Sequence, residues 1–329
     1  MMPQPKNGAG APLSFTLAHS PQGLRLCKTR HPDGTERSYD DAKHFNLAPA
    51  CFADLHGLEA LLRDLAARPD TCVLRGAIAD RNRVHGVRRL LHPDRVTGAL
   101  PTIAPALRAW VATDHDSLHA PPGLDLHDLR ACAETARATL PGAFRVAGCI
   151  FAATAGHTFK AGIRMRGWFL LERPLSSADV RRWLAGVSID HSTLRDAQPI
   201  YTAAPRFIGA ADPLPDRFIR LPGRARVPVP PPDALAPPSP LPKPRAAPGN
   251  MNSQYAATRF AALLREAARG DGERHPRILW AACRVGEMIA AGELGRGLAT
   301  QALIDAAELS GSANATKTVV DGISIGEGA

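Results

Sequence analysis

Ala109-Trp110-Val111-Ala112-Thr113-Asp114-His115-Asp116-Ser117 is the stretch that decides the fold this sequence predicts. Its first half is apolar with β-branched residues, which is typical of a short buried strand. On a strand the two aspartates would lie on one face, about 7 Å apart, with His115 on the other face. Two neighbouring anions repel each other, and a hard divalent cation such as Mg²⁺ or Mn²⁺ relieves that repulsion. The pattern indicates a metal site at a strand end; the ordinary alternative is a solvated Asp-x-Asp turn.

The composition indicates a basic globular chain. It has 329 residues, 45% of them hydrophobic, which suits two domains and a sizeable core. The net charge of +9 favours a polyanionic partner, most often nucleic acid, although some basic proteins are merely soluble. The six cysteines include no Cys-x-x-Cys pair, so neither a disulfide framework nor a zinc knuckle is expected. With no signal peptide at the N-terminus and no run long enough to cross a membrane, the expected compartment is the cytoplasm.

Hydrophobic periodicity predicts helices and strands on both sides of the acidic stretch. Residues 1–12 are expected to be disordered, and residues 14–45 to form a small peripheral hairpin around Pro32-Asp33-Gly34. Residues 77–108 form a basic segment typical of a solvated loop, or of a loop that contacts phosphates. Helices are expected over Phe52–Ala67, Leu126–Leu140 and Ser176–Leu184, and strands over Thr71–Gly76, Phe144–Ala153, Gly162–Leu171, Val187–Asp190 and Gln198–Tyr201. Together they predict an α+β domain over residues 13–222.

The composition changes after Pro222. Eleven prolines occur from Pro222 to Pro248, which predicts a semi-rigid, polyproline-like linker over residues 223–250. Beyond it, three amphipathic segments punctuated by glycine predict a small all-α module over residues 251–329. The expected helices are Asn252–Ala268, His275–Ala291 and Leu298–Leu309.

Two further features bear on the acidic stretch. Arg164 and Arg166 are spaced like the two aspartates, so a strand would place both on one face. Asp190 ends a short apolar run and adds a third carboxylate. Two-metal phosphoryl and nucleotidyl transfer needs carboxylates that hold the metals and cations that hold the phosphates. Each part also has an ordinary explanation, since the arginines suit a solvated strand face and Asp190 suits a helix N-cap or a turn.

The order of these motifs resembles the archaeo-eukaryotic primase superfamily, in particular the bifunctional primase-polymerases of phages, plasmids and integrated elements. That family has an apolar-Asp-apolar-Asp strand, a small residue-x-His strand, and an apolar residue followed by Asp. Thr113-Asp114-His115-Asp116 matches the first motif and Ile189-Asp190 the third. The segments Leu74–Gly76 and Gln198–Phe207 are also similar to the family, and residues 272–294 resemble its helical C-terminal module.

The second motif departs from the family pattern. Arg166 stands near the place of the family histidine, just before Trp168-Phe169, and the nearest histidine is His157. Either Arg166, with Arg164, replaces it as a phosphate ligand, or His157 reaches in from the turn at Gly156. Arginine suits the first role because its guanidinium binds phosphate oxygens bidentately and stays charged. Lys160, in the same loop, is a further candidate for the triphosphate or the template.

The resemblance implies a catalytic domain containing an RNA-recognition-motif-like sheet with helices on one side. It implies that Asp114, Asp116 and Asp190 bind Mg²⁺ or Mn²⁺, and that nucleoside triphosphates and single-stranded DNA are the substrates. The implied activity is that of a DNA primase and polymerase in the replication of a phage or mobile element, in some cases beside a replicative helicase. The helical module would help to hold template or the first nucleotide. Trp110 and Trp168 are expected in the core rather than as stacking platforms.

Two other function classes fit part of the pattern. A metal-dependent glycosyltransferase also uses Asp-x-Asp at a strand end to hold a nucleotide-sugar diphosphate, but it leaves the third aspartate and the basic charge without a role. A non-catalytic replication initiator or template-binding protein with a degenerate primase fold would fit the irregular second motif. A rolling-circle relaxase is disfavoured, because no His-apolar-His pair with a nearby tyrosine is found among only three tyrosines.

Overall fold

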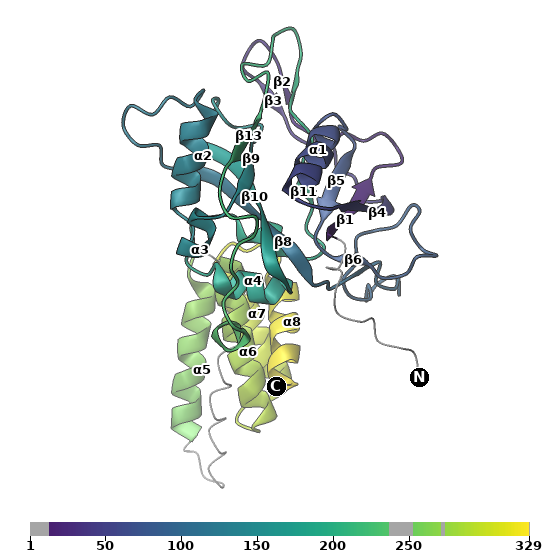
Figure 1. The fold of residues 1–329 in the computed structure, drawn as a ribbon. Coiled ribbons are helices and arrows are strands. Elements are labelled where there is room, and N and C mark those ends of the chain that lie inside the picture. The colour runs from purple at the N-terminus through teal and green to yellow at the C-terminus, as the bar shows by residue number, and fades with distance from the viewer. Residues whose placement is uncertain (1–12, 237–252, 271–273, 329) are drawn as a thin grey trace. The chain divides into compact units, whose positions relative to one another are not determined.

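A computed structural model describes residues 13–236, 253–270 and 274–328 of the chain (Figure 1). They belong to two compact units, which divide between Pro237 and Pro238. The first unit mixes strands and helices and the second is helical, as the sequence predicts. The predicted disorder of residues 1–12 lies outside the described residues. Among the described helices, none combines the length and the apolar character needed to cross a membrane.

The first unit contains a four-stranded antiparallel sheet in the order β13-β9-β10-β8 (Figure 1). Its strands are β8 (Arg108–Leu118), β9 (Cys149–Ala153), β10 (Ile163–Leu175) and β13 (Phe218–Leu221). One face is covered by the helices α2 (Leu129–Ala138), α3 (Gly142–Arg145) and α4 (Ser177–Trp183). Alternate strand residues, among them Val111, Phe151 and Phe169, point to this side and are fully buried against the helices. The other face of the sheet bears the two aspartates of the acidic stretch.

Along the chain these elements follow the β-α-β-β-α-β order of an RNA-recognition-motif-like sheet, but their order in space differs from it. In the split β-α-β arrangement the first and third strands lie side by side and antiparallel at the centre of the sheet. Here β8 also runs antiparallel to β10, but β8 is at the edge, and β9 and β10 occupy the centre. A four-stranded sheet with helices on one side is therefore observed, with a strand order that the resemblance does not imply.

A second four-stranded sheet, in the order β11-β5-β1-β4, faces the first across a shared core. Its strands are β1 (Leu13–His19), β4 (Asn46–Phe52), β5 (Thr71–Leu74) and β11 (Ile200–Tyr201). The predicted helix after Phe52 is confirmed as α1 (Leu55–Ala66), which begins after its N-cap Asp54. Leucines of α1 pack with Phe15, Trp110 and Trp168 between the two sheets, so the prediction that both tryptophans are core residues is confirmed.

The N-terminal region contributes more than the predicted peripheral hairpin. A hairpin does form around Pro32-Asp33-Gly34, but β1 is a central strand and β4 was not predicted at all. Pro49 weakens the strand signal of β4, and the structure tolerates it because β4 is an edge strand. The remaining short strands are β2 (Thr29–Arg30), β3 (Glu36–Arg37), β6 (Ala77–Ile78), β7 (Ile103–Ala104) and β12 (Arg206–Phe207).

Two predicted strand boundaries are wrong. The strand expected from Phe144 begins only at Cys149, because residues 142–145 form the helical turn α3. The strand expected to stop at Glu172-Arg173-Pro174 continues to Leu175 in β10. A shift of register between Leu170 and Leu175 lets the strand accommodate the proline without a ladder hydrogen bond.

Arg75 joins the two halves of the first unit. Its guanidinium is buried and donates hydrogen bonds to the carbonyl oxygens of Trp110 in β8, at 2.6 Å, and of Leu175 in β10, at 2.8 Å. Burial lowers the pKa of this arginine to about 10, which leaves it charged at neutral pH. A cation that follows β5 therefore fixes two strands of the other sheet.

The predicted linker begins too early. Residues 223–236 belong to the first unit, where Val227 is fully buried and exchanges backbone hydrogen bonds with β10, accepting from Glu172 at 3.1 Å and donating to Leu170 at 2.7 Å. The 3₁₀ turn η2 (Pro232–Leu235) then buries Leu235 in the helix-covered core. Prolines allow this path because an extended segment on a sheet edge needs few backbone donors. The rest of the predicted linker lies outside the described residues.

The second unit contains four described helices rather than the predicted three. They are α5 (Ser253–Ala268), α6 (Arg274–Ala290), α7 (Arg296–Leu309) and α8 (Ala315–Glu327). Helix α8 was not predicted, because its glycines and β-branched residues have low helix propensity. The glycines serve close packing instead: a Cβ atom on Gly326 would lie 2.1 Å from the carbonyl oxygen of Cys283 in α6. The close packing of α6 against α8 therefore depends on glycines, which have low helix propensity.

Gly76 provides a test of the packing that supports the site. A Cβ atom there would lie 2.4 Å from Ile103 Cγ2 and 2.9 Å from the carbonyl oxygen of Ala104. We expect Gly76→Ala to lower the free energy of unfolding by roughly 1–3 kcal/mol through overpacking. Gly57→Ala is the matched control, because its Cβ would have no neighbour closer than 3.6 Å in helix α1. Urea denaturation should show the control unchanged or slightly stabilised; equal stability of both variants would contradict the packing described here.

Candidate metal centre and pocket

The pairing of β8 with β10 assembles the first part of the site. Arg166 lies directly opposite Asp114 in the antiparallel register. Because side chains alternate along a strand, Asp114, Asp116, Arg164 and Arg166 all point to the face of the sheet that α2, α3 and α4 leave free. The same alternation points His115 into the interior, where its side chain is buried. The predicted placement of the two aspartates on one strand face is therefore confirmed, although the strand runs on past them to Leu118.

Asp190 reaches the site from a turn and not from the end of a strand. The expected strand over residues 187–190 does not form; Asp190 is the N-cap of the 3₁₀ helix η1 (His191–Leu194). Its side chain accepts hydrogen bonds from the backbone nitrogen of Ser192, at 2.8 Å, and from the Ser192 hydroxyl, at 2.7 Å. Its own backbone nitrogen donates to the carbonyl oxygen of Asp114 at 2.8 Å. Asp190 is thus an N-cap, as the ordinary explanation predicts, and it also lies beside the aspartates of β8, as the metal-site prediction requires.

The three carboxylates meet at one place. Oxygen atoms of Asp114, Asp116 and Asp190 all lie within 4.8 Å of one another. Partial burial raises the pKa of Asp116, and the negative charge of Asp114 raises it further. Asp114 is nearly buried, and its Oδ1 atom has no hydrogen-bond partner. An unpartnered buried carboxylate oxygen beside two other carboxylates is unfavourable unless a cation completes the cluster.

The two arginines have different roles. Arg166 is ion-paired with Oδ2 of Asp114 and also donates to the carbonyl oxygen of Tyr201. Its two terminal nitrogens are therefore engaged within the protein, so it positions Asp114. Arg164 lies 3.9 Å from Asp116, a longer and weaker contact, and its buried Nε has no partner. Arg164 is thus the arginine better placed to bind an added anion.

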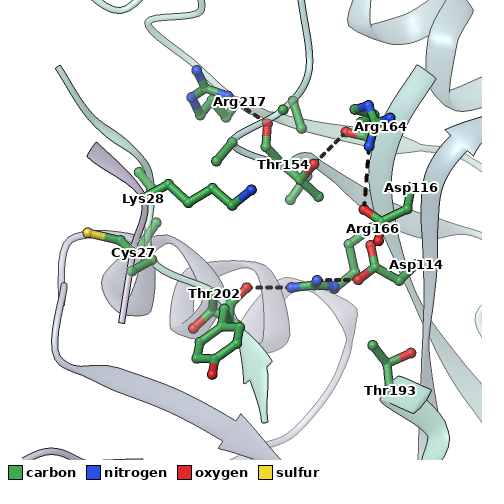
Figure 2. Close-up of a pocket in the computed structure, with 18 of the residues that line it drawn as sticks. Cys27, Lys28, Asp114, Asp116, Thr154, Arg164, Arg166, Thr193, Thr202 and Arg217 are labelled. Carbon is green, nitrogen blue, oxygen red and sulfur yellow. Dashed lines mark hydrogen bonds and ion pairs between the residues drawn. The ribbon is translucent and has the colours of Figure 1, made fainter. Parts of the chain in front are cut away.

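A pocket of about 330 Å³ opens beside the carboxylates (Figure 2). Figure 2 shows Asp114, Asp116 and the two arginines on one wall, with Lys28 reaching in from the opposite side. The cationic side chains that line the pocket are Lys28, Lys160, Arg164, Arg166 and Arg217. The cavity therefore combines a negative cluster at one wall with positive groups around it, an arrangement suited to an anion bound through a metal.

The two loop candidates lie in different places. Lys160 lines the pocket, and its ammonium lies 3.3 Å from Glu36. His157 does not line it: the side chain is fully buried, Nε2 lies 2.8 Å from the carbonyl oxygen of Leu126, and Nδ1 accepts from the backbone nitrogen of Arg164 at 3.1 Å. Because both ring nitrogens are already bonded, His157 holds the loop that leads into Arg164. The structure thus does not bring His157 to the predicted nucleotide position.

Several pocket residues were not predicted. Neither Lys28 nor Arg217 belongs to a sequence motif, and the two are far apart in the chain, so only the folded structure brings them to one cavity. Tyr39 and Tyr201 also line it, with their rings stacked at 4.1 Å between centroids. Tyr201 lies in the segment Gln198–Phe207 that resembles the primase family, so a signal was present for it. No sequence signal marks Tyr39.

Hard oxygen donors make the cluster suitable for Mg²⁺ or Mn²⁺. Three carboxylates within 4.8 Å give the donor type that these ions prefer. Oδ1 of Asp114 has no competing partner, and Asp116 has its side chain 63% exposed, so it is open to a ligand. The local charge, three carboxylates against two guanidinium groups, is negative. The residues present therefore fit a divalent ion.

Comparisons of the chain with protein-family models, with curated proteins and with solved structures find no match. The observations that bear on a function are therefore the pocket, its side chains, the distribution of charge and the order of the sequence motifs.

A metal at this cluster should stabilise the folded protein. We expect MnCl₂ at a hundredfold excess over its dissociation constant to raise the melting temperature by roughly 5 °C or more. Asp114→Asn should abolish most of this rise, and Asp64→Asn, an exposed position on α1, should leave it intact. Asp116→Asn should raise the melting temperature of the metal-free protein, because it removes charge from a carboxyl whose pKa is raised. Differential scanning calorimetry measures all four proteins; an unchanged manganese effect in Asp114→Asn would place the metal elsewhere.

Proposed function

We propose that this protein is a metal-dependent nucleotidyltransferase that makes or extends primers on single-stranded DNA. The observation that carries the proposal is the meeting of Asp114, Asp116 and Asp190 within 4.8 Å, at the wall of a pocket lined with cations. Bound Mg²⁺ or Mn²⁺ would activate a 3′-hydroxyl group and neutralise charge that develops on the transferred phosphate. The primase-polymerase resemblance described above supplies the reaction type, and the replication of a phage or mobile element is its proposed setting.

The chain's own residues would bind and orient the nucleotide. Arg164 has a buried Nε without a partner and only a 3.9 Å contact to Asp116, so it can turn to a phosphate oxygen at little cost. Lys28 and Lys160 share Glu36, at 2.9 and 3.3 Å, and line the same pocket. A triphosphate would compete with Glu36 for these two ammonium groups. Arg166 would keep Asp114 in place while the phosphates bind.

The charge distribution favours the first unit as the site of the proposed DNA contact. Residues 1–237 contain 30 Lys and Arg against 22 Asp and Glu, whereas residues 238–329 contain 10 against 9. Nearly all of the net charge of +9 thus belongs to the unit with the pocket. Binding of a DNA backbone by such a surface weakens steeply with salt. A template-holding role for the helical unit has little electrostatic support, because that unit is almost neutral.

A non-catalytic template-binding protein is the second candidate, and one observation favours it. Arg166 stands where the primase family has a histidine, and it is ion-paired with a proposed metal ligand. Such a pair would suit a protein that retains the fold but does not turn over nucleotides. A glycosyltransferase is less well supported, because it gives no role to Asp190.

Primer synthesis and extension test the proposed function. The wild type, incubated with single-stranded DNA, labelled nucleotides and Mg²⁺ or Mn²⁺, should yield extended products. Replacing both Asp114 and Asp116 by Ala should lower product formation by about a thousandfold or more, because the metal ligands are lost. Asp64→Ala is the control for loss of a carboxylate outside the pocket. Equal extension by the double variant would show that the assigned site is wrong, and single-stranded DNA binding without extension by the wild type would favour the second candidate.

A variant of Arg164 tests whether this arginine binds the nucleotide or the DNA template. Arg164→Ala should raise KM for the nucleotide by roughly tenfold, since a charged hydrogen bond to phosphate is removed, and should leave DNA affinity near that of the wild type. Arg224→Ala, at an exposed position that is not among the pocket-lining residues, is the control. Steady-state kinetics and fluorescence anisotropy with labelled DNA give the two quantities. Equal losses of nucleotide and DNA affinity would make Arg164 a template contact.

A further inference from the structure

Two of the three tyrosines in the chain stack on each other inside the pocket. Tyr39 and Tyr201 both line the cavity, with ring centroids 4.1 Å apart and ring planes inclined by 17°. Their pairing is long-range, since Tyr39 precedes β4 and Tyr201 ends β11. Aromatic residues make up only 5% of the chain, so two tyrosines at one cavity wall are a notable concentration.

The position of Tyr201 is fixed relative to the carboxylates. Tyr201 pairs with Cys72 in the antiparallel β11–β5 ladder, and the Tyr201 carbonyl oxygen accepts a hydrogen bond from Arg166. Arg166 in turn is ion-paired with Asp114. A single guanidinium therefore links the aromatic stack to the proposed metal centre.

The segment that bears Tyr39 is also held in place. Asp40, the next residue, exchanges hydrogen bonds with Arg25: the backbone nitrogen of Arg25 donates to Oδ2 of Asp40 at 2.8 Å, and the backbone nitrogen of Asp40 donates to the carbonyl oxygen of Arg25 at 2.7 Å. The tyrosine nevertheless stays 40% exposed. An aromatic ring held in position and accessible from the pocket loses little conformational freedom when a planar ligand stacks on it.

We propose that the Tyr39–Tyr201 stack is the platform for the nucleobase of the bound nucleotide, an inference that rests on the proposed function. Every base has a π-face, so a tyrosine platform binds bases with little dependence on their sequence. The ammonium of Lys28 lies 5.9 Å from the centroid of the Tyr39 ring, so a phosphate-binding cation adjoins the platform. The pocket then offers three neighbouring contacts for one ligand: metal and arginine for the phosphates, lysine beside them, and the aromatic stack for the base.

Binding measurements without DNA test the platform. Isothermal titration calorimetry in Mg²⁺ would compare dATP with inorganic tripolyphosphate, which has the phosphates and no base. Tyr39→Leu should weaken dATP binding about tenfold, the loss expected for one stacked base, and leave tripolyphosphate binding unchanged. Tyr39→Phe keeps the ring and should bind both as the wild type does. Tyr255→Leu removes the third tyrosine, which is exposed on α5 outside the pocket lining, and is the matched control.

Three outcomes would overturn the inference: unchanged dATP affinity in Tyr39→Leu, equal loss of dATP and tripolyphosphate affinity, or no dATP binding by the wild type. Unchanged tripolyphosphate binding also shows that a variant is folded. Primer extension by the same proteins separates this inference from the proposed function. If the wild type extends primers and Tyr39→Leu binds dATP normally, the platform is refuted and the proposed activity is supported. If dATP binding depends on Tyr39 and no protein extends primers, the platform is supported and the proposed activity is refuted.

Discussion

The register of β8 against β10 is the constraint on which the rest of the site depends. It sets Arg166 opposite Asp114 and turns the acidic and basic pairs of the two strands toward the same cavity. A slip of one residue would turn one pair into the helix-covered core, where unpaired charges are prohibitive. Arg75, through its bonds to Trp110 and Leu175, fixes both strands from the neighbouring sheet. The framework therefore specifies where the charges point before any ligand is bound.

Gathering three carboxylates is unfavourable for the protein alone. The pKa of Asp116 is raised by partial burial and by the charge of Asp114, so the ionised form of this carboxyl is destabilised in the folded protein. The ion pair with Arg166 offsets part of this destabilisation, and the backbone of η1 stabilises Asp190 as an N-cap. Oδ1 of Asp114 remains without a partner. Proteins tolerate such local instability mainly where it serves binding or catalysis, and a cation at this cluster would reverse the repulsion.

Periodicity predicted the parts of the fold that are long and regular, and missed those decided by tertiary packing. The acidic strand and α1 carry clear patterns, so both were predicted. Helix α8 was missed because its glycines serve close contact with α6, which local propensity cannot express. At the site, Asp190 was selected first by the apolar run that precedes it and then by the resemblance to primase-polymerases, and the structure brings it close to Asp114. Tyr39 could not be predicted, because only the folded chain brings it to Tyr201.

The central claim is that the three carboxylates bind divalent ions next to a nucleotide. Anomalous X-ray scattering from crystals of the protein grown with Mn²⁺ and dATP tests it most directly. The account predicts two manganese peaks about 4 Å apart, each about 2 Å from oxygens of Asp114, Asp116 or Asp190. Manganese bound only at other residues, with the three carboxylates free, would contradict it.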